Sequence, residues 1–280
     1  MRRGVVVHGG AGSPRSLSDG PAGAAESAMH ILVGGGDAVD ASTEATRVME
    51  DDERFNAGTG SVLRMDGIPY MDAAVMSSDE ECGAVAYLTR TKNPVLVARK
   101  VLDTPHILLV ADGAVEFARK CGFNDYDPAT AASRARLERG TAEFGRGNRP
   151  KWPRNWATYK VDTVGAVARD GRGRFAASGS TGGTFPALRG RVGDIAMIGC
   201  GIFAGRHGAV AATGIGEEII RKVLSKTVYD YMKEDISAQE AADRGIALFD
   251  RSISVGVITI NDSGFGIAST TDMASHAITD

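Results

Sequence analysis

Asp162-Thr163-Val164-Gly165-Ala166-Val167-Ala168 is the stretch that decides how this 280-residue chain is interpreted. Small and β-branched residues run from 163 to 168, an Asp170-Gly171 pair follows, and a second apolar run covers 175 to 178. Two such runs around Asp-Gly are typical of a β-hairpin. We therefore expect a buried strand that begins directly behind Asp162 and Thr163. The length fits one large domain or two small ones.

The composition excludes several classes of protein. Hydrophobic residues make up 43% of the chain, and no apolar run reaches the roughly 18 residues that a membrane-spanning helix needs. A net charge of -3 gives no overall attraction to nucleic acid. Cys82, Cys121 and Cys200 are too few for a disulfide scaffold and lack zinc-site spacing. Residues 1–10 lack the apolar core of a signal peptide, so we expect a cytoplasmic protein.

Hydrophobic periodicity on either side of the hairpin predicts a mixed α/β protein. Strands and helices follow in groups, which favours sheets covered by helices. The predicted strands are 4–8, 70–76, 83–88, 192–203 and 209–213, with a closing hairpin of 253–260 and 265–269. The predicted helices are 37–49, 95–102, 113–121 and 219–232, and a capping box at Ser237 to Glu240 starts another.

Residues 123–160 have few aliphatic side chains, scattered glycines and both tryptophans, Trp152 and Trp156, and we interpret them as a linker. The segment is locally basic, which is also typical of a nucleic-acid-binding arm. A solvated linker kept out of the core by its charge is the favoured interpretation. Its basic residues are Arg134, Arg136, Arg139, Arg146, Arg149, Lys151, Arg154 and Lys160.

No single one of the following motifs identifies a function by itself. His8-Gly9-Gly10 is similar to the oxyanion loop of lipases, but the chain has no Gly-x-Ser-x-Gly nucleophile, so a structural role in a turn is favoured for His8. The Gly-x-Gly pieces at 58–60, 199–201 and 214–216 complete no nucleotide-binding motif. The five histidines lack metal-ligand spacing.

Four polar motifs stand at the ends of predicted strands, and together they carry a family resemblance. They are Asp162-Thr163-Val164-Gly165, Ser180-Thr181-Gly182-Gly183, Gly190-Arg191-Val192-Gly193-Asp194 and Thr213-Gly214-Ile215-Gly216-Glu217. With His8-Gly9-Gly10-Ala11-Gly12 and the stretch from Arg54 to Val62, the set resembles the plant-type asparaginase and isoaspartyl peptidase family of N-terminal nucleophile hydrolases. The resemblance covers most of the chain except the linker and the last few residues.

The resemblance implies a four-layer αββα sandwich, formed as one hydrolase domain over 1–280 that cuts itself between Asp162 and Thr163. The products are an α chain, 1–162, which carries the 123–160 linker, and a β chain, 163–280. Thr163 then becomes the nucleophile. Its freed α-amine, with an ordinary pKa of about 7.7 to 8.0, is the base. The implied activity is hydrolysis of L-asparagine and β-aspartyl dipeptides.

The resemblance also assigns roles to single residues. Thr181 orients the hydroxyl of Thr163, and Thr213 with the amide of Gly214 forms the oxyanion hole. The substrate's α-carboxylate and α-ammonium go to Arg191 and Asp194, as a clamp. Gly216 and Asn56 complete the substrate site, and Asn56 lies near the cleavage point.

No cofactor is implied, apart from a structural sodium ion held by backbone carbonyls. These belong to Met49, Glu50, Asp52, Phe55, Ala57 and Thr59. The implied partners are the small-molecule substrate and a second αβ unit in a dimer, with no membrane and no nucleic acid.

This chain departs from the family pattern at several places. Ile195 stands where serine is usual, and Met197 and Cys200 replace smaller or polar residues, which leaves substrate preference near Asp194 open. The short tail after Gly264 leaves a C-terminal wall of the pocket in question.

Two alternatives remain open. A glycosylasparaginase is ranked second because its Thr-Gly-x-Gly-Asp motif has Glu217 in place of the aspartate here. A nucleic-acid-binding or partner-binding protein, which would use the basic linker and carry a vestigial site, is the alternative from another class.

Overall fold

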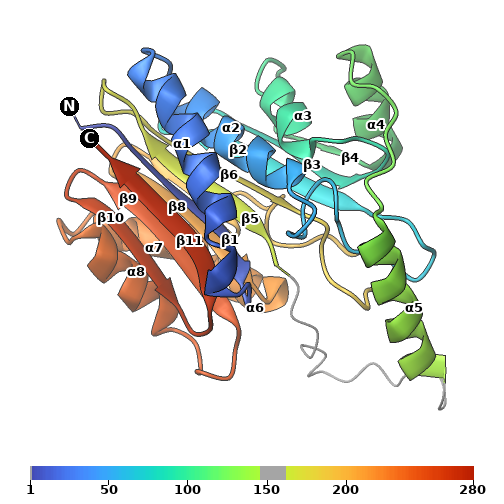
Figure 1. Ribbon diagram of the computed structural model, residues 1–280. Helices are drawn as coiled ribbons and strands as arrows, with labels where there is room; N and C mark the ends of the chain where they lie inside the picture. The colour runs from blue at the N-terminus through green and yellow to red at the C-terminus, as the bar shows by residue number, and fades with distance from the viewer. Residues whose placement is uncertain (1, 146–161) are drawn as a thin grey trace.

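The computed structural model describes residues 2–145 and 162–280, and in them two β-sheets lie among helices (Figure 1). The seven-stranded sheet has the order β11-β1-β5-β6-β2-β3-β4 and the four-stranded sheet the order β10-β9-β8-β7. The first contains β1 Gly4–Ala11, β2 Met71–Ser77, β3 Cys82–Leu88, β4 Leu108–Val110, β5 Val164–Arg169, β6 Phe175–Thr181 and β11 Met273–Thr279. The second contains β7 Ile202–Gly205, β8 Gly208–Gly214, β9 Val255–Asn261 and β10 Gly264–Ser269. The mixed α/β class is confirmed.

Eight α-helices and one short 3-10 helix are described. They are η1 Arg15–Leu17, α1 Asp19–Val33, α2 Ala38–Asp51, α3 Pro94–Val101, α4 Ala111–Lys120, α5 Ala131–Gly145, α6 Gly216–Lys222, α7 Leu224–Met232 and α8 Ala238–Ile246. The predicted caps of α2 and α8 form, since Asp37 and Ser237 each accept a hydrogen bond from the amide three residues on. None of the helices described is long and apolar enough to cross a membrane.

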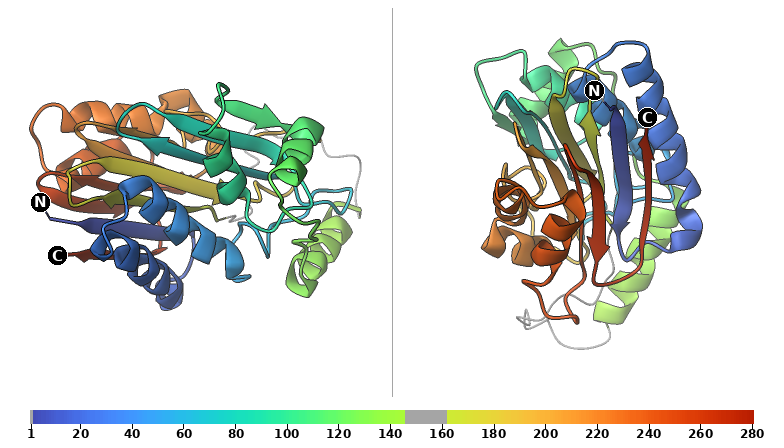
Figure 2. Two further views of the ribbon diagram at one scale, coloured as in Figure 1. Left: turned by 90° about the horizontal axis from the view of Figure 1, so that it is seen from above. Right: turned by 90° about the vertical axis from the view of Figure 1, so that its left-hand side faces the viewer.

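Alternation along β1 shows how the layers pack. Val5 and Val7 lie in a buried cluster with α1 and α2, whereas Val6 lies in a second cluster between the two sheets. Successive side chains of a strand point to opposite faces, so β1 is buried on both sides. The helices α7 and α8 lie on the outer side of the four-stranded sheet (Figure 2), and a third cluster packs them against it.

The register of the central strands brings the two threonines of the predicted nucleophile site together. Val164 on β5 pairs with Ser180 on β6, and Thr181, the next residue, pairs with Asp72 on β2. Thr163 therefore enters the sheet where β6 ends. The predicted hairpin of 163–168 and 175–178 is confirmed.

The linker prediction is wrong over Ala131–Gly145, which forms α5. Few aliphatic residues suggested irregular chain, but Ala, Arg, Leu and Glu are strong helix formers. Thr130 and Ser133 exchange side-chain-to-amide hydrogen bonds at the start of this helix. Both tryptophans, and the basic residues from Arg146 to Lys160, lie outside the described residues.

The strand predicted over 192–203 is wrong except at its end, where β7 begins at Ile202. The apolar spacing there comes from loop residues that fill the gap between sheets, and Ile195 is fully buried in that cluster. The carbonyl of Asp194 accepts hydrogen bonds from the amides of Met197 and Gly201, which turns the loop back on itself.

The helix predicted over 219–232 is two helices, because Val223 has φ 45° and ends α6 before α7 begins. The closing hairpin is confirmed as β9 and β10. The tail after it forms β11, which sequence reasoning missed and which pairs with β1.

Candidate active site

The hydroxyl of Thr163 lies at the centre of the candidate site. Thr163 is 5% exposed, and its Oγ1 donates a hydrogen bond to Oγ1 of Thr181 at 3.2 Å. The Thr181 hydroxyl in turn accepts the amide of Gly183 at 3.0 Å. These contacts restrict the direction of the Thr163 hydroxyl and place Thr181 beside it. A threonine held in this way is suited to nucleophilic chemistry once a base removes its proton.

Asn56 contacts the peptide bond that is predicted to break. Its Nδ2 donates to the carbonyl oxygen of Asp162 at 2.7 Å and to that of Gly183 at 2.8 Å. Its Oδ1 accepts the amide of Val62 at 2.8 Å, so the orientation of the side-chain amide is fixed from three sides. A donor on the Asp162 carbonyl stabilises negative charge that would develop there during attack on this bond.

The end of β1 joins the cleavage point to Thr213. Gly10 has φ +109°, and a Cβ on it would lie 2.8 Å from the amide nitrogen of Thr163. The next residue, Ala11, donates its amide to Oγ1 of Thr213 at 3.1 Å. Neighbouring residues of one strand therefore touch the Asp162-Thr163 peptide and the predicted oxyanion threonine. Gly214 follows at the end of β8 with φ +133°.

Arg191 is held by Glu217 rather than by Asp194. Nε and Nη2 of Arg191 donate to the two carboxylate oxygens of Glu217 at 3.0 and 3.1 Å, in a two-pronged ion pair. Burial raises the pKa of Glu217, but the hydrogen bonds and positive charge of Arg191, with smaller contributions from a backbone amide and Arg221, together leave that pKa below its usual value. Nη1 of Arg191 takes no part in this ion pair.

Asp194 is a buried carboxyl with an unused oxygen. It is 5% exposed, and Oδ2 accepts no hydrogen bond from the described residues. Burial raises its pKa to about 7, although the positive charge of Arg191 opposes the shift. A Cβ on Gly216 would lie 2.8 Å from both Nη2 of Arg191 and Oδ1 of Asp194, so glycine there leaves room for both clamp side chains. A buried carboxylate of this kind is suited to a cationic ligand.

The predicted sodium loop follows α2. The amide of Thr59 donates to the carbonyl of Glu50 at 2.9 Å, and the amide of Phe55 to that of Asp52 at 3.1 Å, so the segment curls into a closed loop. Its carbonyl oxygens are donors of the type that hard cations bind. No cluster of three or more His, Cys, Asp or Glu side chains that could hold a metal occurs in 2–145 and 162–280.

Several residues that raised questions in the sequence lie in the core. Ile195 packs between the sheets and Cys200 packs with α7 and α8, whereas Met197 is 39% exposed. His8 is fully buried, and burial lowers its pKa to about 3, so it is neutral.

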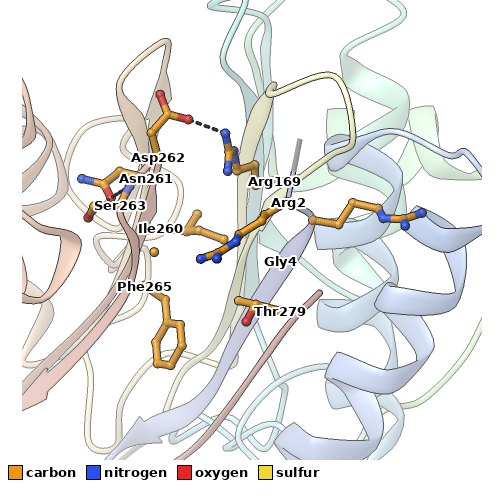
Figure 3. A pocket seen from close by; sticks show the side chains of 11 residues that line it. Arg2, Gly4, Arg169, Ile260, Asn261, Asp262, Ser263, Phe265 and Thr279 are labelled. Carbon is orange, nitrogen blue, oxygen red and sulfur yellow. Dashed lines mark hydrogen bonds and ion pairs between the residues drawn. The ribbon is translucent and has the colours of Figure 1, made fainter.

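A cavity of about 290 Å³ lies at the far end of β1 and β5 (Figure 3). It contains none of the predicted site residues. Its lining includes Arg2, Arg169 and Phe265, and Arg169 is paired there with Asp262.

Sequence reasoning missed two residues behind the clamp, Asp72 and Tyr87. The sequence could have drawn attention to Asp72, because it is a charged residue within the predicted strand 70–76. Burying a charge costs free energy unless the group is paired or hydrogen-bonded. It is 1% exposed and contacts the amide of Gly193.

Comparison with known proteins finds a matching family and similar relatives over nearly the whole length of the chain. The asparaginase family model matches residues 1–279. The chain is similar to a plant-type L-asparaginase of Pyrococcus abyssi (strain GE5 / Orsay), with 39% identity over 98% of this chain and 95% of the relative. It is 38% identical to an isoaspartyl peptidase/L-asparaginase of Danio rerio, over 93% of this chain and 86% of the relative. An isoaspartyl peptidase/L-asparaginase of Bos taurus is also 38% identical, over 93% and 87%. The chain belongs to the asparaginase family.

Proposed function

We propose that this protein is a self-processing amidohydrolase that cleaves L-asparagine and β-aspartyl dipeptides with Thr163 as its N-terminal nucleophile. One observation carries the proposal: the Thr163 hydroxyl is oriented by Thr181 while Asn56 binds the carbonyl of the preceding residue. The relatives named L-asparaginase and isoaspartyl peptidase support the two substrates. The three packing clusters support the four-layer αββα sandwich of N-terminal nucleophile hydrolases.

These contacts support the following route for self-cleavage. Oγ1 of Thr163 attacks the carbonyl carbon of Asp162, and Asn56 donates to the oxygen that becomes negative. When this tetrahedral intermediate collapses, the carbon–nitrogen bond breaks and Asp162 is left as an ester on Oγ1. The hydroxyl proton is transferred to the freed amine. Water then hydrolyses the ester, releasing the carboxylate of Asp162 and restoring the hydroxyl. The products are the α chain, 1–162, and the β chain, 163–280.

The mature site then uses the same hydroxyl on substrate. The new α-amine takes the Thr163 proton, Oγ1 attacks the substrate's side-chain amide, and ammonia or an amino acid leaves with that proton. Thr213 and the amide of Gly214 stabilise the oxyanion. Water releases L-aspartate from the acyl-enzyme. Arg191 and Asp194 bind the α-carboxylate and α-ammonium that both substrates share.

The sodium ion is a further part of the proposal. Six carbonyls, those of Met49, Glu50, Asp52, Phe55, Ala57 and Thr59, would hold it, and the closed loop, which contains Asn56, supports the assignment. The ion would stiffen the segment that carries Asn56. The dimer of αβ units remains a prediction for size-exclusion measurement, and the free cysteines fit a reducing compartment such as the cytoplasm.

The test is a denaturing gel combined with assays of ammonia release from L-asparagine and of β-aspartyl dipeptide hydrolysis. We expect two bands and both activities in the parent chain, with neither in Thr163→Ala. An uncut parent, or a cut parent without activity on either substrate, would refute the proposal. Activity restricted to asparagines that carry a sugar would favour the glycosylasparaginase alternative.

A further inference from the structure

The loop that carries the clamp is attached to the seven-stranded sheet at two backbone amides, one on each side of Arg191. The amide of Gly190 donates to Oη of Tyr87 at 2.7 Å, and the amide of Gly193 donates to Oδ2 of Asp72 at 2.9 Å. We call residues 190–194 the clamp loop. Because irregular loops lack a ladder of backbone bonds, each such attachment restricts where the side chains of the loop lie.

Asp72 and Tyr87 are also bonded to each other. The amide of Tyr87 donates to Oδ1 of Asp72 at 2.9 Å, so one carboxylate holds both the strand β3 and the clamp loop. Asp72 is 1% exposed, which makes each of these bonds hard to replace by water. Burial raises the pKa of Asp72, and the two amides and the charges of Arg191 and Arg64 act against that rise.

An irregularity in strand pairing aims Tyr87 at the loop. Met71 pairs with Leu88 and Ala73 pairs with Val85, so two residues of β3 oppose the single residue Asp72. This β-bulge places Tyr87 at φ 57°, in the left-handed region that tyrosine rarely adopts. Such strain persists where surrounding contacts hold it and is concentrated at functional sites.

Tyr70 supports the pair of Asp72 and Tyr87, which we call the platform. Its ring stacks on that of Tyr87, with centroids 4.0 Å apart and planes 15° from parallel, and its hydroxyl donates to Asp66 instead of to the loop. The Tyr87 ring is thus held by stacking, while its hydroxyl alone reaches Gly190.

We propose that Asp72 and Tyr87 are positioning residues for substrate binding, which hold the clamp loop so that Arg191 and Asp194 are aligned before substrate arrives. The side-chain hydrogen bonds of both residues go to backbone amides and not to Thr163. The inference rests on the proposed function, since the clamp is defined by the substrate's α-carboxylate and α-ammonium. It predicts that removing a hydrogen bond between the platform and the clamp loop weakens substrate binding and leaves the reactivity of Thr163 unchanged.

Tyr87→Phe is the main test, and Tyr70→Phe is its matched control. Each removes one hydroxyl from the same stacked pair, but only the first removes the acceptor of Gly190. We expect Tyr87→Phe to self-cleave like the parent, to raise KM for a β-aspartyl dipeptide roughly 3- to 10-fold and to leave kcat within about twofold. The Kd for L-aspartate, measured by calorimetry on the cut protein, should rise by the same factor. Tyr70→Phe should leave KM and Kd unchanged.

Asp72→Asn provides a second variant in which one acceptor becomes a donor facing a backbone amide. A larger rise in KM is expected, about 10- to 100-fold, because a charge-assisted bond is lost. Equal KM and Kd values in Tyr87→Phe, Tyr70→Phe and the parent would overturn the inference. A fall in kcat or in self-cleavage with KM unchanged would also overturn it. A parent that hydrolyses neither substrate would instead refute the proposed function, so the two failures are distinguishable.

Discussion

Replacing Asn56 by aspartate tests the self-cleavage geometry with almost no change in shape. Asn56→Asp keeps an oxygen for the Val62 amide but exchanges the Nδ2 donor for a second oxygen. That oxygen then faces the carbonyl oxygens of Asp162 and Gly183, which Nδ2 contacts at 2.7 and 2.8 Å in the parent. Burial raises the pKa of a carboxyl at this position, so the comparison is made at pH 8, where the ionised form repels the oxyanion that Asn56 stabilises.

The size of the effect follows from the lost donor. Removing one oxyanion donor costs about 2.7–4 kcal/mol, or about 10²- to 10³-fold in rate, so self-cleavage should slow by at least this factor. Two lost hydrogen bonds cost folding roughly 1–3 kcal/mol, which lowers Tm by several degrees without unfolding a typical domain. The rate effect therefore exceeds the stability effect.

The measurement is a pulse of cell-free synthesis followed by timed samples on a denaturing gel, with Tm recorded for the uncut chain. Tyr126→Phe is a matched control, because it removes the Tyr126 contact with the Thr59 hydroxyl in the same loop and leaves Asp162 untouched. Cutting of Asn56→Asp within about threefold of the parent rate, at pH 8 and with a folded chain, would refute the assigned role of Asn56.

Four further predictions concern the nucleophile and the clamp. Thr163→Ala should remain one band, and any cut at residue 162 in this variant would exclude the hydroxyl as attacker. Asp194 has a folded pKa of about 7, above that of the unfolded chain, so KM should rise as pH falls from 8 to 6. The same shift makes its contribution to stability decline as pH rises through about 7, so Asp194→Asn should melt above the parent at pH 8 but not at pH 4. A Tm difference independent of pH would contradict the shift. Arg191→Leu should be cut normally yet lose about 10- to 150-fold in kcat/KM, whereas a loss under about threefold would make the Arg191–Glu217 pair purely structural.

The local sequence pattern was sufficient to predict an element where its apolar residues followed the period of that strand or helix. The strands around Val6, Val75 and Val167 were predictable because buried central strands appear as short apolar runs between turns. The helix α5 could have been found from propensity alone. The loop that follows Asp194 could not, because Ile195 and Ile198 fill a gap between two sheets instead of following a strand period.

The sequence by itself determined the candidate residues: the Asp162-Thr163 pair, Thr181, Thr213, Arg191 and Asp194 all stand in motifs that can be read from the chain. Only the tertiary structure decided their contacts, since Asn56 lies 106 residues from Asp162, and Ala11 lies 202 residues from Thr213. It also decided that Glu217 holds Arg191, and that Asp72 and Tyr87 hold the loop. The physical reason is that hydrogen bonds and burial act between groups close in space, and the pairing of distant strands brings those groups together.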